Sequence, residues 1–307
     1  MSVPVCVLGL GLIGGSVLRA ATAAGRETWG YNRSGVAAAD GFAVSSDLAA
    51  TLRRAAAEEA LVLIAVPMTA VEPVLAAVAE HAPGCALTDA VSVKVAVAQA
   101  VARYGLSARY VGGHPMAGTS QSGWAASEAG LFRDAAWVVA ADDGLDVGVW
   151  QLVAQLALDC HAHVVPAAAA EHDAAVAKIS HLPHVLAAVL AAVGGDGGEL
   201  ALSLAAGSFR DGTRVAATRP ELVRAMCEAN DAALLEAIDD AAARLSAARE
   251  SLRSNSSVAD VIDEGYRARV RLDTLVRHSI TGVDFASAEV MARLREAGRA
   301  GGALRIL

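Results

Sequence analysis

Hydrophobic residues in the first half of the chain form short runs that alternate with amphipathic stretches. Apolar runs predict strands at residues 3–8, 27–31, 59–66, 85–90, 109–111 and 136–140. Ala-rich stretches with helical periodicity lie between them, at residues 13–24, 47–56, 69–80 and 93–103. Strands that alternate with helices in this way predict a doubly wound α/β domain with a parallel sheet.

The pattern changes after residues 160–166, where strand signals become rare. Long Ala-rich stretches with helical periodicity follow at residues 167–190, 199–203, 220–253 and 258–277. Residues 194–198 and the polar residues 208–214 are predicted as loops between these helices. A chain of 307 residues is long enough for two cores. We therefore expect an α/β domain over residues 1–166 and an all-helical domain over residues 167–307.

Composition refines this picture. Hydrophobic residues make up 55% of the chain but aromatic ones only 4%, so the helices offer mainly Ala, Val and Leu for packing. Such helices often complete their burial against a second subunit, which predicts a homodimer through the helical domain. The most apolar windows, residues 60–68 and 185–193, are shorter than the roughly 20 residues of a membrane span, so no membrane association is expected. The start of the chain lacks a signal peptide, which predicts a cytoplasmic protein.

Charge and cysteine spacing exclude other classes. The formal net charge of −8 disfavours binding to nucleic acid, and an anionic substrate would need a local cationic pocket. The four cysteines are scattered and show no Cys-x-x-Cys spacing, so neither a disulfide framework nor a metal centre is expected.

A glycine-rich turn follows the first predicted strand directly. Its sequence is Gly9-Leu10-Gly11-Leu12-Ile13-Gly14, and a predicted helix begins within it. The first glycine allows a tight turn, the second lets a pyrophosphate approach the backbone, and the third allows close packing of helix and strand. We therefore predict a Rossmann-type dinucleotide site formed by Gly9, Gly11, Leu12, Ile13 and Gly14, with Val66 and Pro67 at the end of a neighbouring strand. A purely structural glycine turn is the alternative.

The end of the second strand bears on the choice of cofactor. It carries Asn32-Arg33-Ser34, without the carboxylate that usually binds the ribose hydroxyls of NAD. Arginine at this place accommodates a 2′-phosphate, so NADP is predicted as the cofactor, with NAD as a possible second one. The alternative is that Arg33 is an exposed turn residue.

Two polar residues follow strands in the α/β half. His114 comes after residues 109–111, in a Gly- and Pro-rich loop at the carboxyl edge of the predicted sheet, where ligands bind in open α/β sheets. Ser92 lies between the strand at 85–90 and the next helix. It could cap that helix, and it could also orient His114 or a substrate hydroxyl.

The helical half carries further candidates. Asp173, His181 and His184 lie on one face of a predicted helix, which Pro183 should kink by freeing the carbonyl of Ile179. These histidines could be core residues or, with Glu171, metal ligands, although the spacing does not match a known metal motif. In the loop at 208–214, Arg214 is a candidate for binding a carboxylate.

Taken together, these segments resemble the prephenate and arogenate dehydrogenases of tyrosine biosynthesis. The similarity rests on six segments spread over residues 9–214, namely GLGLIGGS at 9–16, SVK at 92–94, GHPMAG at 113–118, HD at 172–173, SHLPH at 180–184 and FRDGTR at 209–214. It implies a dehydrogenase that removes hydride and carbon dioxide from prephenate to give 4-hydroxyphenylpyruvate. Arogenate, giving tyrosine directly, is the alternative substrate.

The resemblance also implies roles for the candidate residues. His114 would accept the proton of the ring hydroxyl, as suits an imidazole that titrates near neutrality, and Ser92 would hold the same hydroxyl. Arg214 would pair with a substrate carboxylate and His184 would contact the substrate side chain. The remaining pocket would be formed by His181, Asp173, Thr119 and Ser120.

Two other functions fit part of the pattern. A 3-hydroxyacid dehydrogenase would use a lysine early in the helical half, where Lys178 lies. A non-catalytic NAD(P)-sensing module would explain the glycine turn but not His114, His184 and Arg214.

Overall fold

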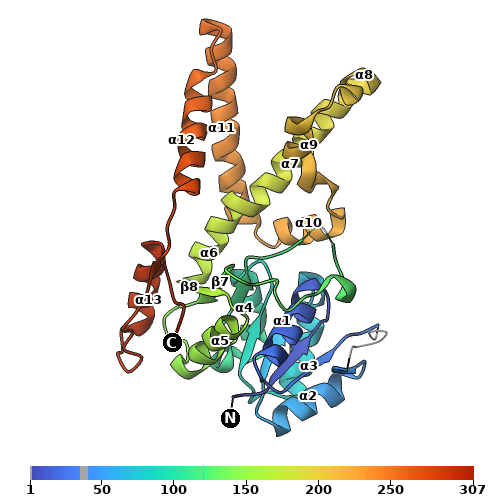
Figure 1. Ribbon diagram of the computed structural model, residues 1–307, viewed down its shortest axis with the longest axis vertical. Helices are drawn as coiled ribbons and strands as arrows, with labels where there is room; N and C mark the ends of the chain where they lie inside the picture. Colours follow the sequence, from blue (N-terminus) through green and yellow to red (C-terminus); the bar gives the residue numbers. More distant parts are fainter. Residues whose placement is uncertain (1, 35–40, 120) are drawn as a thin grey trace. The chain divides into compact units, whose positions relative to one another are not determined.

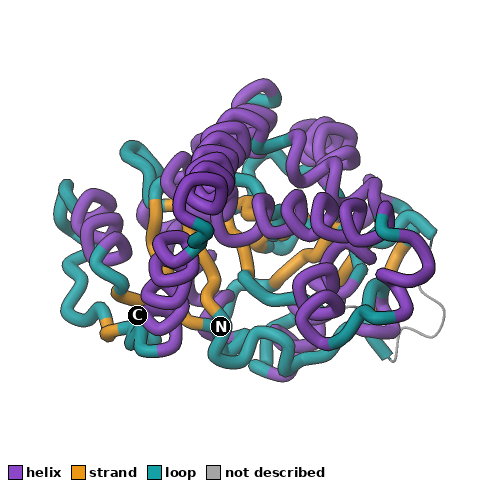
Figure 2. The backbone as a smooth tube through the Cα atoms, turned by 90° about the horizontal axis from the view of Figure 1, so that it is seen from above, coloured by secondary structure: helices purple, strands orange, loops and turns teal. Residues whose placement is uncertain are grey.

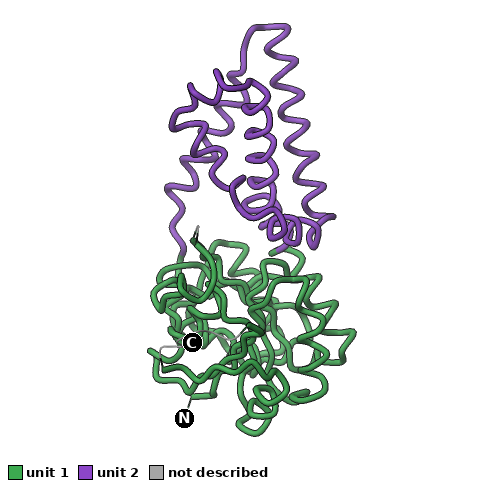
Figure 3. The backbone as a smooth tube through the Cα atoms, turned by 90° about the vertical axis from the view of Figure 1, so that its right-hand side faces the viewer, with its two compact units in different colours: residues 1–172, 278–307 green, residues 173–277 purple. Residues whose placement is uncertain are grey.

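The chain divides into two compact units, coloured separately in Figure 3. The computed structural model describes residues 2–34, 41–119 and 121–307. Unit 1 consists of Met1–His172 and His278–Leu307, and unit 2 of Asp173–Arg277. These units differ from the expected ranges 1–166 and 167–307 in two ways. Unit 1 extends to His172, and the last 30 residues pack with the α/β part and not with the helices before them.

Five parallel strands form the main sheet of unit 1. Their spatial order is β3 (Ala43–Ser45), β2 (Thr28–Tyr31), β1 (Val5–Leu8), β4 (Leu61–Ile64) and β5 (Leu87–Asp89). Figure 1 shows unit 1 with its helices labelled, and Figure 2 shows its strands in orange among the helices. Both β1 and β4 are buried at every position, as parallel strands covered on both faces must be. The order 3-2-1-4-5 is that of dinucleotide-binding folds, so the predicted Rossmann-type sheet is confirmed.

Two layers of helices accompany this sheet. In one, α1 (Leu12–Ala23) packs against α5 (Val147–Asp159); in the other, α2 (Leu48–Ala57), α3 (Val71–His81) and α4 (Val95–Arg103) pack in series. Helices α1 to α4 were all predicted. Helix α5 was not, because it buries apolar residues such as Val149 and Trp150 around much of its surface and shows little periodicity.

A second sheet contains β6 (Gly113–Pro115), β7 (Ala136–Ala140) and β8 (His163–Ala167). Strand β6 is antiparallel to β7, and β7 is parallel to β8. The strand predicted at residues 109–111 is wrong: residues 107–109 form a 3-10 turn, and of this segment Tyr110 alone is bridged to the main sheet, at Leu87. His114 therefore lies within a strand and not in the expected loop.

The C-terminal segment packs on β8. It contains β9 (His278–Ser279), α13 (Val290–Arg299) and β10 (Gly302–Ala303), and Leu304 forms an antiparallel bridge to Val164 of β8. Helix α13 approaches β8 so closely that a Cβ added to Gly298 would lie 1.9 Å from the carbonyl oxygen of Pro166. Helical periodicity cannot predict such a contact, because it reports one buried face but not which distant strand covers it.

Unit 2 is helical, as predicted. The chain enters it through α6 (Ala169–Val176), a π-helical turn (Ala177–His181) and α7 (Leu182–Asp196), and Pro183 lies in the first turn of α7. The disruption expected at Pro183 therefore takes the form of a π turn. The other helices of unit 2 are α8 (Gly198–Ser203), α9 (Gly207–Thr213), α10 (Pro220–Glu228), α11 (Asp231–Asn255) and α12 (Ala259–Asp273).

The loop predicted at residues 208–214 is instead helix α9 followed by a 3-10 turn, Arg214–Ala217. Gly207 and Gly212 disfavour a helix in isolation. The ring of Phe209, however, packs onto α7 so closely that a Cβ on Gly194 would lie 2.4 Å from it. Packing on α7 thus outweighs the low helix propensity of the segment.

The helix over Ala169–Asp196 is long and apolar enough to span a membrane by length and composition, with a mean hydropathy of 1.6. The expectation that every apolar window is too short is therefore wrong, because the apolar helix continues on the N-terminal side of residues 185–193, where Val176, Ile179 and Leu182 lie among polar residues. Only 22% of that window is buried within the chain. Its exposed apolar side chains include Ile179, Val189 and Val193.

Candidate active site

The glycine turn of unit 1 has the geometry expected of a dinucleotide site. Gly9 has a φ of +101°, and a Cβ there would lie 2.7 Å from the carbonyl oxygen of Ala65. A Cβ on Gly14 would lie 1.9 Å from the carbonyl oxygen of Gly9, so turn, helix and strand leave no room for a side chain. Gly11, directly before α1, has no atom within 4 Å of its Cβ position. The turn is therefore closed toward the protein and open at Gly11, where a diphosphate can meet the helix N-terminus.

Asn32, Arg33 and Ser34 follow β2 but differ in their surroundings. The side-chain oxygen of Asn32 accepts a hydrogen bond from the backbone N–H of Leu10, at 3.3 Å. Arg33 and Ser34 are exposed. Asn32 thus ties the end of β2 to the glycine turn, whereas the exposed Arg33 and Ser34 are accessible to a ligand.

The predicted contacts at the end of β4 lie beside this turn. A Cβ on Gly9 would lie 2.8 Å from Cγ1 of Val66. Val66 therefore borders the glycine turn, whereas the neighbouring Pro67 is exposed at the start of a 3-10 turn.

A buried ion pair lies where β5 ends. Lys94 pairs with Asp89, and their side chains are 1% and 0% exposed. Lys94 also donates to the carbonyl oxygen of Gly113 at 2.6 Å, and the Tyr110 hydroxyl donates to Asp89 at 2.6 Å. Ser92 lies in the turn between the two charges. Because α4 begins at Val95 and Lys94 occupies the cap position, Ser92 does not cap the helix, and the capping alternative is wrong.

His114 lies on β6, directly after Gly113, and is half-buried. Its Nδ1 lies 2.8 Å from Nε2 of His172, and the two rings meet edge to face with centroids 5.0 Å apart. His172 lies on α6 and is 3% exposed. Sequence reasoning missed His172, although it belongs to the HD segment on which the family resemblance partly rests.

Of the two pocket residues predicted after β6, Thr119 and Ser120, the structure describes Thr119. The hydroxyl of Thr119 accepts a hydrogen bond from the backbone N–H of Gln121 at 3.1 Å, and Thr119 is exposed. Ser120 lies outside the described residues. The role of both residues in substrate binding stays a prediction.

In unit 2, His181 and Asp173 belong to a buried network. The side-chain amide of Asn230 donates to the carbonyl oxygen of Asp173 at 2.8 Å and lies 3.2 Å from Nδ1 of His181. His181 is 0% exposed, and Asn230 precedes helix α11. This arrangement is the one expected if His181 is a core residue, and Asn230 joins α11 to the π turn.

His184 and Arg214 lie near each other in unit 2. His184 is on the first turn of α7 and Arg214 begins the 3-10 turn that packs on this helix. Burial lowers the pKa of His184 below its ordinary value. The nearby positive charge of Arg214 lowers it further, while a hydrogen bond to the Val215 backbone opposes the shift. An imidazole shifted toward its neutral form thus lies beside the exposed Arg214 guanidinium, which can pair with an anionic ligand.

Two alternatives from the sequence find no support in the geometry. Glu171, considered as a metal ligand, pairs with Arg299 and accepts from the backbone N–H of Ala168. Within the described ranges, no group of three or more His, Cys, Asp or Glu side chains is placed to hold a metal ion. Lys178 is a surface residue, 3.8 Å from the exposed Asp240, and does not resemble a catalytic lysine.

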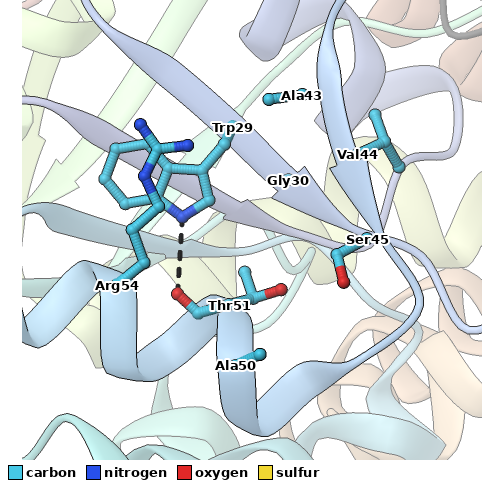
Figure 4. A pocket seen from close by; sticks show the side chains of 8 residues that line it. All are labelled: Trp29, Gly30, Ala43, Val44, Ser45, Ala50, Thr51 and Arg54. Atoms are coloured by element: carbon cyan, nitrogen blue, oxygen red, sulfur yellow. Dashed lines mark hydrogen bonds between the residues drawn. The ribbon is translucent and has the colours of Figure 1, made fainter.

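A shallow pocket of about 240 Å³ lies elsewhere in unit 1, beside the sheet edge formed by β2 and β3 (Figure 4). The guanidinium of Arg54 stacks on the Trp29 ring at 4.0 Å, and Trp29 donates to the carbonyl oxygen of Thr51. None of the predicted site residues lines this pocket. We assign it no ligand, because its charged group is already engaged by the ring and by Glu27 and Glu58.

Comparison with known proteins bears on both units. Residues 17–166 match the model of the prephenate dehydrogenase nucleotide-binding domain, and residues 168–264 that of the prephenate dehydrogenase dimerization domain. A Corynebacterium glutamicum crystal structure, described provisionally as a prephenate dehydrogenase, is 49% identical with a TM-score of 0.93 and covers 100% of both chains.

Two further relatives carry different names. The cyclohexadienyl dehydrogenase of Zymomonas mobilis is 30% identical over 88% of this chain and 96% of its own. The crystal structure of Synechocystis arogenate dehydrogenase is 26% identical, with a TM-score of 0.73 over 88% of this chain and 99% of its own. The similarity therefore reaches proteins named for more than one substrate.

The surroundings of His184 predict its titration. We expect its NMR titration midpoint to lie below the ordinary value of about 6.5, because burial and Arg214 disfavour the imidazolium. A histidine with a lowered pKa in the folded state stabilises the fold above the unfolded pKa, and this contribution is lost as the pH falls. Arg214→Ala should raise the midpoint. A midpoint at or above the ordinary value in the unmodified protein would contradict this account.

Proposed function

The chain belongs to the prephenate dehydrogenase family, and on this basis we propose that it oxidises and decarboxylates prephenate to 4-hydroxyphenylpyruvate with NADP as hydride acceptor. The observation that carries the proposal is the half-buried His114, held by a second histidine in the same unit as a glycine turn shaped for a dinucleotide. Arogenate is the alternative substrate.

The residues around the glycine turn fit a nicotinamide dinucleotide. Gly9 and Gly14 leave no space for side chains, and Gly11 is open. When bound, the nicotinamide supplies the acceptor for the hydride of the substrate carbinol. Arg33, exposed at the end of β2, is the group we propose for the 2′-phosphate, with Ser34 as a hydrogen-bond donor. NAD would lack the contact with Arg33.

His114 is the proposed general base. It takes the proton of the ring hydroxyl, so that electron density from the oxygen assists departure of the hydride from the same carbon. Loss of carbon dioxide then leaves the electron pair of the broken C–C bond in the ring, which becomes aromatic, and the ring oxygen regains a proton to give the phenol. This step renders the reaction effectively irreversible. We assign Ser92 to the same hydroxyl, because it lies in the turn enclosed by the Asp89–Lys94 pair.

The proposed anion-binding residues belong to unit 2. Arg214 is exposed and carries a fixed positive charge, and His184 beside it favours the neutral form. We propose that Arg214 pairs with a substrate carboxylate and His184 contacts the side chain, with His181 and Asp173 supporting the helix. Thr119 and Gln121 offer no carboxylate for the amino group of arogenate, which is why we favour prephenate.

Replacing the base should slow the chemical step. We expect His114→Asn to lower kcat roughly 100- to 10,000-fold, the usual contribution of a general base, with little change in cofactor affinity. Arg214→Ala serves as the contrasting variant and should chiefly raise the KM for the substrate. Formation of reduced cofactor is followed with prephenate and, separately, with arogenate. Near-normal turnover by His114→Asn would exclude the base, and turnover with arogenate alone would reverse the substrate assignment.

The cofactor assignment has its own test. Arg33→Ala should raise the KM for NADP roughly 10- to 100-fold, as expected when a hydrogen bond to a charged group worth about 1.5–3 kcal/mol is lost. The KM for NAD should change little, because NAD has no 2′-phosphate. Steady-state kinetics with both cofactors measures this, with the exposed Arg53→Ala of α2 as a matched control. A strong preference of the unmodified enzyme for NAD would contradict it.

We also propose that the enzyme is a cytoplasmic homodimer joined through unit 2. The matching family model is described as a dimerization domain, and unit 2 exposes many large apolar side chains, among them Leu200, Leu204, Ile262 and Tyr266. We expect analytical ultracentrifugation at micromolar concentration to give the mass of two chains. Ile262→Glu together with Tyr266→Glu should shift this toward one chain if α12 takes part. A monomer in the unmodified protein would exclude the dimer.

A further inference from the structure

The side chain of His114 is held at one ring nitrogen by His172. The contact of 2.8 Å joins Nδ1 of His114 to Nε2 of His172, and the rings stand at 76° to each other. Between two imidazoles, one nitrogen must donate its proton and the other must accept. The contact therefore couples the tautomers of the two residues.

Only one of the two arrangements suits a base. A neutral imidazole that accepts a proton at Nε2 must carry its own proton on Nδ1. Nδ1 of His114 then donates to Nε2 of His172, which must be unprotonated. In the reverse arrangement His172 donates, and the proton of neutral His114 sits on Nε2, where it blocks proton uptake at that atom.

We propose that His172 is a positioning residue that holds His114 in the tautomer with its proton on Nδ1, so that Nε2 is the atom that accepts the substrate proton. This inference rests on the proposed function of His114. After proton uptake, the Nδ1–H group still donates to His172, now from a cation, so the same hydrogen bond becomes stronger. His172 thus orients the ring in both states.

The structure holds His172 firmly enough for this role. It lies in the first turn of α6, where the Asp142 carboxylate accepts from the backbone N–H of Ala169 at 3.1 and 3.2 Å. Glu171 accepts from the N–H of Ala168 in the same turn. These contacts satisfy donors at the start of the helix, and the 3% exposure of His172 limits its rotation.

The backbone of His114 is held independently of its ring. The carbonyl oxygen of the preceding Gly113 accepts from Lys94, and the N–H of Gly113 donates to Asp89 at 3.4 Å. His114 itself pairs with Val138 of β7. These contacts hold the main chain and involve no atom of the ring, so the contact with His172 acts on the ring separately.

The tautomer can be measured without turnover. In the unmodified protein with no substrate, at about two pH units above the ordinary histidine pKa of about 6.5, a long-range ¹H–¹⁵N correlation spectrum should show His114 protonated on Nδ1 and His172 accepting at Nε2. The His114→Asn and His172→Leu variants assign the two sets of signals. Protonation of neutral His114 on Nε2 would overturn the inference, whatever the substrate proves to be.

Kinetics provide the second measurement. His172→Leu removes the acceptor and should lower kcat roughly 10- to 150-fold, the loss expected for a hydrogen bond to a charged group, with the KM for both ligands nearly unchanged. His172→Gln can place an amide oxygen near the former Nε2 and should recover most of kcat. His163→Gln, a half-buried histidine on β8, is the matched control and should leave kcat unaltered.

The outcomes separate the inference from the proposed function. If His114→Asn is inactive and His172→Leu retains full kcat, His114 remains the base and the role of His172 is wrong. If His172→Leu and His172→Gln lose activity equally, the hydrogen bond is not what His172 contributes, and the inference is again overturned. If His114→Asn retains turnover, the proposed base fails first.

Discussion

The buried pair of Lys94 and Asp89 is the interaction around which unit 1 arranges its polar residues. Both charges are almost fully removed from water, and an unpaired charge in that position would cost several kcal/mol. Asp89 is also held by the Tyr110 hydroxyl and by backbone N–H groups, and Lys94 by the carbonyl oxygen of Gly113. The pair therefore binds together the end of β5, the start of α4 and the start of β6.

The glycine turn and His114 are held in place by different contacts. The glycine turn lies after β1 and is held by close backbone contacts, since neither Gly9 nor Gly14 can accept a side chain. His114 lies after the segment that Lys94 and Asp89 fix, and its ring contacts His172. The glycine turn and His114 are thus held by separate sets of contacts, so that binding of a cofactor at the turn need not move His114.

Unit 2 follows a different principle. Its interior network joins Asn230 to the backbone of Asp173 and to His181, while many of its large apolar side chains face outward. Exposed apolar surface of this kind is typical of an interaction site. This part of the chain matches a family model described as a dimerization domain, and the dimer proposed above would cover apolar side chains of the helix over Ala169–Asp196.

Local patterns in the sequence were sufficient for much of this architecture. The alternation of strands and helices, the glycine turn and the helical second half follow from periodicity and from the backbone freedom of glycine, and these properties act over a few residues. The motifs around Ser92, His114, His184 and Arg214 were sufficient for the family. Local patterns gave wrong predictions in two places. In α9, packing on α7 outweighed the low helix propensity of the segment; in α5, burial around much of the helix removed the hydrophobic periodicity by which a helix is predicted.

Other features were decided by tertiary structure alone. The sequence does not show that Asn32 binds the glycine turn, that residues 278–307 return to β8, or that Lys94 and Asp89 neutralise each other beneath Gly113. His172 is 58 positions from His114, and nothing in its neighbours along the chain indicates the partner of its ring. The reason is physical: hydrogen bonds and close contacts depend on separations of a few ångströms in space, and only the folded chain brings such distant residues together.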